Sequence, residues 1–274
     1  MGLRINTNIQ SLQAQRNLAR TSERLSGNFR KLSTGLRISS AGDDAAGLAI
    51  AERLRARARS LDQAARNAND GISLVSTGEG GLSEISNILV RLRELSIQAN
   101  TDTTSDADKD TLNNEFQSLI EEIDRISQAT DFNGVDVLSS SATLTLHIGD
   151  QTTASVDTLD LTLQSMRADD LNISSLNIGS AGNPEASITA IDSALDTVNN
   201  YRASLGAIQN RLTSTVSHLN ILAENLRSGE SRIRDLDVAR ETADLTRNNI
   251  IQQAGVAILA QANAQPNLAL QLLG

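Results

Sequence analysis

The sequence lacks cysteine and tryptophan, and it holds only one tyrosine, three phenylalanines and two prolines among its 274 residues. Without cysteine, disulfides, thiolate metal sites and a cysteine nucleophile are excluded. Because aromatic side chains are so few, leucine, isoleucine, valine and alanine must fill the interior, and they suit thin seams between helices better than the thick core of an enzyme. Two prolines leave most of the chain free to form helices.

Long apolar runs are also missing. No stretch reaches the roughly 20 apolar residues that a membrane span needs, so we expect no membrane insertion. The first residues lack the apolar run, about 7–15 residues long, of a secretory signal peptide. If the protein leaves the cell, we expect a route that needs no cleaved signal.

The net charge of −9 is spread unevenly along the chain. Residues 1–66 carry twelve basic and five acidic side chains, a balance of +7, whereas residues 101–200 carry three and eighteen, a balance of −15. Such asymmetry indicates separate surfaces that meet different neighbours. The basic part has no interleaved aromatic residues, so we do not expect it to bind nucleic acid.

Apolar residues recur at steps of three or four over three long stretches, residues 50–92, 112–126 and 188–226. This spacing predicts helices that pair along narrow, coiled-coil-like seams and together form a bundle. The glycines of residues 78–81 are expected to kink or break the first helix. The predicted fold class is mainly α, with a small β-rich insert.

The insert is predicted at about residues 132–180. Apolar and polar residues alternate with period two at 143–148, 159–163 and 171–173, as they do in strands. Asn133-Gly134 lies between two short apolar pieces and predicts a tight turn.

The two ends of the chain form amphipathic helices of another kind, because neither has a neighbouring sequence that could bury its apolar stripe. Apolar surface that cannot be covered within one subunit is most simply covered between subunits. We therefore expect these stripes to pack between copies of the chain; they comprise Ile5, Ile9, Leu12, Leu18, Leu25, Phe29, Leu32 and Leu36 near the start, and Ile250, Ile251, Val256 and Leu259 near the end.

Sets of residues that could perform catalysis are not evident. The two histidines, His147 and His218, lie in different segments, and the sequence contains no HExxH, GxSxG or phosphate-loop motif. Asp43-Asp44 could share acid–base chemistry, but acidic side chains also favour a helix N-terminus, which is our interpretation here. The acidic residues between 102 and 110 lack the pattern of a calcium loop. We expect no enzyme, no cofactor and no metal site.

Several motifs closely resemble those of bacterial flagellins, and they occur in that family's order. The resemblance covers about residues 1–140 and 188–274. Its motifs are Leu-Ser-Thr-Gly-Leu-Arg-Ile at 32–38, Ala-Gly-Asp-Asp-Ala-Ala-Gly-Leu-Ala-Ile at 41–50, Asn-Asp-Gly-Ile-Ser at 69–73, Arg-Leu-Arg-Glu-Leu at 91–95, Phe-Asn-Gly at 132–134, Leu-Gly-Ala-Ile-Gln-Asn-Arg at 205–211, Ile-Gln-Gln-Ala-Gly at 251–255 and Leu-Ala-Gln-Ala-Asn at 259–263.

The resemblance implies a subunit that polymerises with itself into the flagellar filament for swimming. Residues 1–42 and 236–274 would form the inner tube, and residues 43–235 would form the surrounding shell without large outer domains. It further implies export of the unfolded chain through the filament, an extracellular location, and contacts with a filament cap, hook-junction proteins and an export chaperone. Because the apolar stripes of the terminal segments need partners, we expect these segments to be largely disordered in the monomer and to become helical on assembly.

The resemblance also implies a surface that the animal Toll-like flagellin receptor reads in some members. The matching positions are Arg91, Leu95 and Glu115, preceded by Val90 where a polar residue is common. The same residues could serve only the packing of subunits, and both interpretations stay open.

Three alternatives are weighed against a flagellin. A hook–filament junction protein shares helical ends but usually lacks this full set of motifs. A generic coiled-coil scaffold or an export chaperone does not need flagellin motifs at both ends. An enzyme would need a hydrolytic insert in the middle of the chain.

Overall fold

A computed structural model describes residues 7–153 and 156–271 of the chain, with side chains as far as Gln265. The fold is mainly α, as predicted. The chain divides into two compact units: a terminal unit, Met1–Ala56 with Asn225–Gly274, and a central unit, Arg57–Glu224. Its elements are α1 (Ile9–Thr34), α2 (Ala45–Ala99), α3 (Asp106–Ala129), β1 (Asp131–Phe132), β2 (Val135–Asp136), β3 (Thr143–His147), β4 (Thr158–Thr162), α4 (Pro184–Arg234) and α5 (Val238–Gln271).

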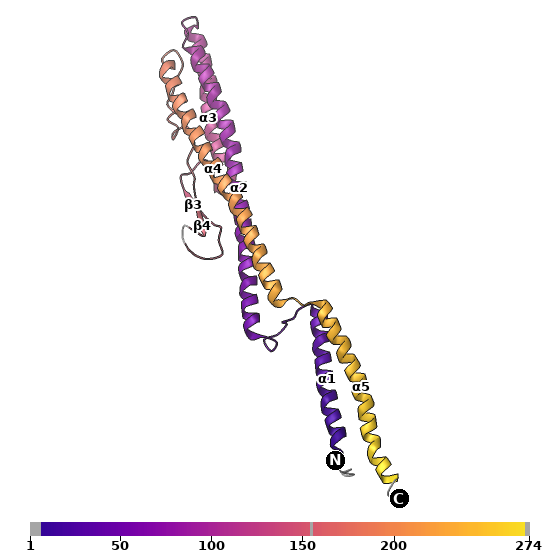
Figure 1. Cartoon of the computed structure of the whole chain (residues 1–274). Helices are drawn as coiled ribbons and strands as arrows, with labels where there is room; N and C mark the ends of the chain where they lie inside the picture. The colour runs from indigo at the N-terminus through magenta and orange to yellow at the C-terminus, as the bar shows by residue number, and fades with distance from the viewer. Residues whose placement is uncertain (1–6, 154–155, 272–274) are drawn as a thin grey trace. The chain divides into compact units, whose positions relative to one another are not determined.

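The central unit is a bundle of α2, α3 and α4, and the three predicted helices are confirmed (Figure 1). Arg93 of α2 pairs with Asp192 of α4 at 2.7 Å, and Arg202 of α4 lies 4.0 Å from Glu79, so these two helices run antiparallel. Their facing apolar side chains form one continuous core with α3. Its fully buried members include Leu82, Ile85, Leu89, Leu92, Phe116, Ile123 and Leu205.

The glycines of 78–81 do not break α2, so that prediction is wrong: the helix runs unbroken from Ala45 to Ala99. Gly78 and Gly81 instead allow close packing. A Cβ atom on Gly78 would lie 2.8 Å from Val137, and one on Gly81 would lie 2.7 Å from both Leu138 and Thr130. The segment after α3 therefore packs against the helix backbone where side chains are missing.

The insert consists of two short antiparallel hairpins, β1–β2 and β3–β4, and a longer stretch of turns. Asn133 and Gly134 form the predicted tight turn, with positive φ angles of 52° and 78°. The prediction of a strand at 171–173 is wrong, since Leu171 and Ile173 lie in turns that place both side chains in the bundle core. The alternation of apolar and polar residues at 171–173 therefore reflects the burial of these two side chains and not a strand.

The hairpin β3–β4 covers one side of the bundle with its apolar face. Leu146 lies so close to α2 that a Cβ atom on Gly71 would approach it to 2.6 Å. The Asn67 amide donates a hydrogen bond to the His147 carbonyl at 2.9 Å, and Arg57 pairs with Asp150 at 2.6 Å. His147 is an exposed residue at the end of β3.

The terminal unit contains α1 and α5, which lie side by side in Figure 1. Ser11 of α1 contacts Asn263 of α5, and Leu18 lies beside Gly255, so the two helices run antiparallel. The unit also takes in the first residues of α2 and the last of α4. It is therefore larger than the segments 1–42 and 236–274 expected from the sequence.

Candidate assembly surface

The face along which α1 and α5 meet, called the seam below, is built from small side chains. Its buried residues are Ser11, Ala14, Thr21 and Ala262. Gly255 adds to it, because a Cβ atom there would lie 3.3 Å from the side chain of Leu18. Small side chains remove little apolar area from water, so the seam contributes little of the stabilisation that a helix pair usually gains from burial.

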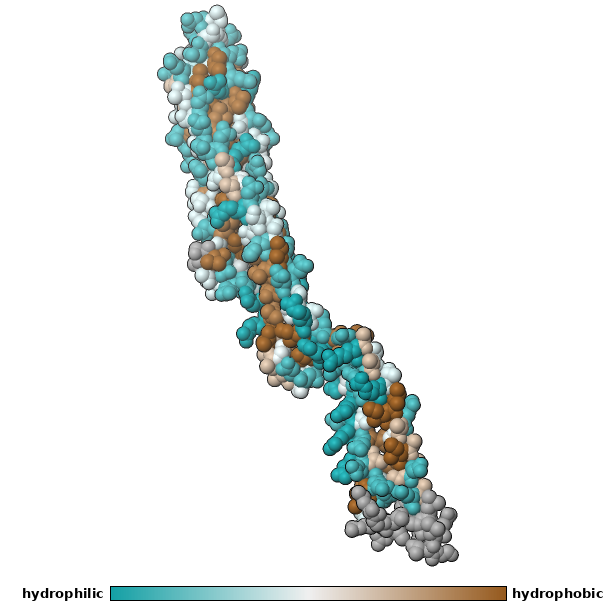
Figure 2. All heavy atoms as spheres, in the orientation of Figure 1, coloured by the Kyte–Doolittle hydropathy of each residue, from teal (hydrophilic) through white to brown (hydrophobic). Residues whose placement is uncertain are grey.

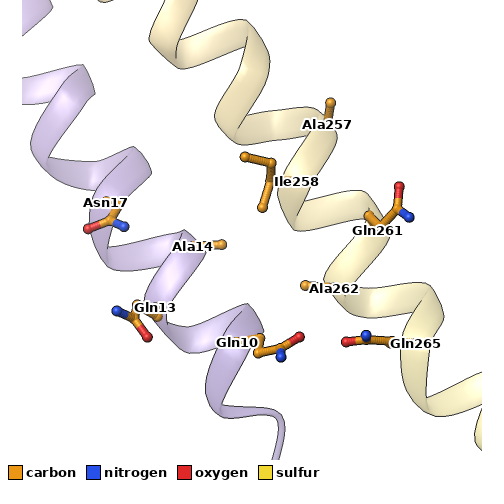
Figure 3. Close-up of a pocket in the computed structure, with 9 residues that line it drawn as sticks. All are labelled: Gln10, Gln13, Ala14, Asn17, Ala257, Ile258, Gln261, Ala262 and Gln265. Atoms are coloured by element: carbon orange, nitrogen blue, oxygen red, sulfur yellow. The ribbon is translucent and has the colours of Figure 1, made fainter.

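Polar contacts cross the seam near one end of the pair. The Asn8 amide donates to the Ala262 carbonyl at 2.7 Å, and the Ser11 hydroxyl donates to Asn263 Oδ1 at 2.7 Å. Beside them the two helices leave a groove of about 500 Å³. Figure 3 shows its lining, which is rich in amide side chains: Gln10, Gln13, Ala14, Asn17, Ala257, Ile258, Gln261, Ala262 and Gln265.

Large apolar side chains lie on the outside of the pair, on a surface called the outer face below. Nine of the thirteen exposed large hydrophobic residues in the described part of the chain belong to the terminal unit. Figure 2 shows hydrophobic side chains gathered on the visible side of this pair. Those on α1 and α5 are Ile9, Leu12, Phe29, Val238, Ile250, Ile251, Val256 and Ile258.

The stripe residues expected from the sequence fall into two groups. Ile9, Leu12, Phe29, Ile250, Ile251 and Val256 are exposed and belong to the outer face, whereas Leu18, Leu25, Leu32, Leu36 and Leu259 are half-buried. Ile5 lies outside the described residues. Val238 and Ile258, which belong to the same C-terminal apolar stripe of the sequence, are exposed as well. The seam was not predicted from the sequence. The signal for the seam was the regular spacing of Ser11, Ala14 and Thr21 on one helix face.

The acidic pair Asp43-Asp44 caps local structure. Asp44 accepts a hydrogen bond from the Gly47 backbone N–H at 2.9 Å, at the start of α2, as interpreted from the sequence. Asp43 accepts from the backbone N–H groups and then from the hydroxyls of Ser39 and Ser40, and these bonds lower the pKa of its carboxyl to about 2. A carboxylate held ionised in this way is unsuited to acid–base catalysis.

The expected receptor surface lies on the central unit. Arg91 of α2 pairs with Glu115 of α3 at 2.7 Å and with Glu94 at 3.2 Å, and the hydrogen bonds to Glu115 and then Glu94 raise the pKa of the Arg91 guanidinium. Leu95 is fully buried in the core of the bundle. Val90 and Ile97 are about half exposed beside this pair.

The described residues contain no group of three or more histidine, cysteine, aspartate or glutamate side chains that could hold a metal ion. Asp102, Asp106, Asp108 and Asp110 lie in and after a turn that leads into α3. Ser105 caps that helix by accepting from the Asp108 N–H at 3.3 Å. None of the described helices has an apolar stretch long enough to span a lipid bilayer.

Two family models match the chain. The bacterial flagellin N-terminal helical region matches residues 5–143, and the bacterial flagellin C-terminal helical region matches residues 188–273. A flagellin of Halalkalibacterium halodurans is 46% identical over 270 residues, covering 98% of this chain and 99% of the relative. A flagellin of Bacillus subtilis is 39% identical, covering 99% and 100%.

Solved structures agree with these matches. The crystal structure of Bacillus cereus flagellin is 34% identical, with a TM-score of 0.50, over 56% of this chain and 88% of that one. The structure of a putative flagellar hook-associated protein from Vibrio parahaemolyticus has a TM-score of 0.60 over 70% of this chain and all of that one. Its identity is only 15%, so it shows likeness of fold alone.

Proposed function

The chain belongs to the bacterial flagellins, the structural subunits of the extracellular swimming filament, and on this premise we propose that its terminal helix pair carries the contacts that make it polymerise. Members of the family are filament subunits and not enzymes. In this proposal the chain polymerises with copies of itself and contacts hook-junction proteins. Residues 1–42 and 236–274 form the inner tube in this proposal, and residues 43–235 form the shell.

The observation that carries the proposal is the distribution of apolar side chains in the terminal unit. The seam buries small residues, whereas Ile250 is 61% exposed and Ile258 is 62% exposed on the outer face. Burying the remaining half of such a side chain contributes on the order of 1 kcal/mol. Neighbouring copies that cover the outer face therefore stabilise the pair more than its own seam does.

The same distribution supports folding on assembly. A helix pair whose seam buries mainly serine, alanine and threonine gains little from pairing, and isolated helices are marginal in water. The terminal segments of the exported monomer are then largely unfolded and become helical when neighbours cover their apolar residues. Export of the unfolded chain, assisted by a chaperone and completed under a filament cap, is part of this proposal.

The first test removes residues 236–274. The shortened chain is expected to keep the helical central unit and to stay soluble without forming filaments, as followed by circular dichroism, sedimentation and electron microscopy. Normal filament growth from it would overturn the proposal.

A matched pair of single variants sharpens the test. Ile250 and Ile221 are both exposed isoleucines on helices, at 61% and 59%, but Ile250 lies in the terminal unit and Ile221 in the central unit. Ile250→Asn is expected to raise the critical concentration for polymerisation several-fold, while Ile221→Asn changes it much less. Equal effects would place assembly outside the terminal pair.

A second role is proposed for the surface of Arg91 and Glu115, which is recognition by the animal Toll-like flagellin receptor. The exposed charges and the exposed Val90 beside them support a contact surface, with Leu95 as packing beneath it. A reporter-cell assay with purified monomer tests this role. Absence of any signal at saturating protein would end it and leave the surface to subunit packing.

A further inference from the structure

The two connectors of the terminal unit are hydrogen-bonded to each other. One connector, residues 35–44, joins α1 to α2, and the other, residues 235–237, joins α4 to α5. Leu36 and Asp235 form an antiparallel bridge. The Leu236 N–H donates to the Gly35 carbonyl at 3.0 Å, and the Arg37 N–H donates to the Arg234 carbonyl at 2.7 Å. Chain segments about 200 residues apart are thereby held in one fixed alignment.

The Arg37 side chain adds a cap to the end of α4. Its Nη2 donates to the Ile233 carbonyl at 2.5 Å and to the Arg232 carbonyl at 3.3 Å. The last carbonyls of a helix have no partner within the helix, and a cation is favoured at this end of the helix dipole. Arg37 therefore links the connector after α1 to the end of α4 through the last carbonyl groups of α4, which have no hydrogen-bond partner within that helix.

Arg234 extends this set of contacts to α2. Its guanidinium pairs with Glu52 at 2.8 Å and lies 3.8 Å from Glu230, and its side chain is only 15% exposed. Ile38, next to Arg37, is 4% exposed. The connectors are thus held by backbone bonds, one helix cap, one ion pair and a buried apolar side chain.

The seam of α1 and α5 has few contacts of its own that fix the alignment of the two helices: two hydrogen bonds near Ser11, and Leu18 beside Gly255. Its fully buried residues are small, so they add little interlocking packing that would oppose a shift of one helix along the other. The distance from Gly35 to Ser11 is roughly 36 Å along a helix, and Ser11 still meets Asn263 there. The connectors lie where α1 ends and α5 begins, and they fix the alignment at the opposite end of the pair from these bonds.

We propose that Arg37, with the Leu36–Asp235 bridge, sets the register of the terminal helix pair and so positions the outer face for polymerisation. Arg37 is a positioning residue in this assignment, and its partner is the carboxyl end of α4 in the same chain. The inference rests on the proposal that the terminal pair carries assembly. If the chain without residues 236–274 still polymerises, that proposal fails first.

The test uses the full chain and exploits its lack of cysteine. Cysteines introduced at Ser11 and Asn263 report the native register, and cysteines at Ser11 and Leu259 report a shift of one helical turn. Each pair is combined with Arg37→Met or with Arg232→Met. The second variant is a matched control, because it removes one positive charge at the same place and keeps the Arg232 carbonyl that Arg37 uses.

Filaments of each variant are grown on seeds and treated with a short thiol crosslinker. Arg37→Met is expected to raise the critical concentration about three- to tenfold, as loss of an exposed charge-assisted cap allows, and to move crosslinking toward the Ser11–Leu259 pair. Arg232→Met is expected to leave both readouts unchanged, and Arg37→Lys is expected to restore most of the native crosslinking. The inference would be overturned if Arg37→Met kept the native Ser11–Asn263 crosslinking and the native critical concentration. It would also be overturned if Arg232→Met changed both readouts as much as Arg37→Met does.

Discussion

Gly80 and Gly81 are adjacent residues of α2, and we expect alanine to have opposite effects on stability at the two positions. A Cβ atom on Gly80 would have no neighbour within 4 Å, whereas one on Gly81 would lie 2.7 Å from Leu138 Cδ1 and from Thr130 Oγ1. Leu138 is fully buried, and its carbonyl accepts the Ser127 hydroxyl at 2.5 Å, so it has little freedom to move. The methyl group of an alanine at position 80 therefore lies in open space. At position 81 it meets the packed side chains of Leu138 and Thr130.

The magnitudes follow from two effects. Replacing glycine by alanine at a solvent-exposed position away from the helix ends stabilises the helix by about 1 kcal/mol. An added methyl group in a packed site costs about 1–3 kcal/mol. Gly80→Ala is thus expected to raise the free energy of unfolding by about 1 kcal/mol, and Gly81→Ala to leave it unchanged or lower it by up to about 2 kcal/mol.

Tyr201 makes the measurement specific to the central unit. It is the only tyrosine in a chain without tryptophan, it belongs to that unit, and it is 6% exposed. Thermal unfolding followed by tyrosine fluorescence should place Gly80→Ala above Gly81→Ala, with about 2–4 °C for each kcal/mol of difference. Equal or reversed melting temperatures would refute the view that Gly81 is present for close packing.

Three further predictions concern single side chains. Burial raises the pKa of Tyr201 above its ordinary 10.0, so the folded chain keeps a proton that the unfolded chain loses, and the stability of the central unit should fall above about pH 10; urea unfolding of Tyr201→Phe should show no such fall. Asp43 has a lowered pKa of about 2, so its stabilisation is present above the ordinary 3.8 and is lost as the pH falls through 2. Asp43→Asn should abolish that acid dependence in the amide exchange of Ser39 and Ser40. Leu95→Ala should lower the free energy of unfolding by about 2–5 kcal/mol, measured by urea denaturation, because the side chain is fully buried.

The helices were predictable because their apolar residues repeat at the helical period over many turns. The error at Gly78 and Gly81 arose because a glycine in a helix has two causes, a break or a close neighbour, and only the folded structure supplies the neighbour at Val137 or Leu138. The error at Leu171 and Ile173 arose because alternating apolar and polar residues show only that every second side chain is buried. A series of turns can bury side chains in the same alternating pattern as a strand.

The candidate site was predictable only in part. The exposed stripe residues, such as Ile9 and Ile250, could be named because no neighbouring sequence offered them cover. The seam could not, since serine and alanine at helical spacing look like an ordinary polar face. The cap on α4 could not either, because Arg37 and Ile233 are brought together by the crossing of two connectors far apart in the chain.

The arrangement of small residues inside the terminal pair and large ones outside bears on how the sequence can evolve. A seam residue such as Ala14 is constrained by the helix opposite it in its own chain, so its acceptable replacements are decided within one gene product. An outer-face residue such as Ile258 has no such partner, and any compensating change for it lies on another copy encoded by the same gene. In a filament, different surfaces of neighbouring copies meet, so a mutation at such a position is compensated at a second position of the same gene, which favours paired substitution over single drift.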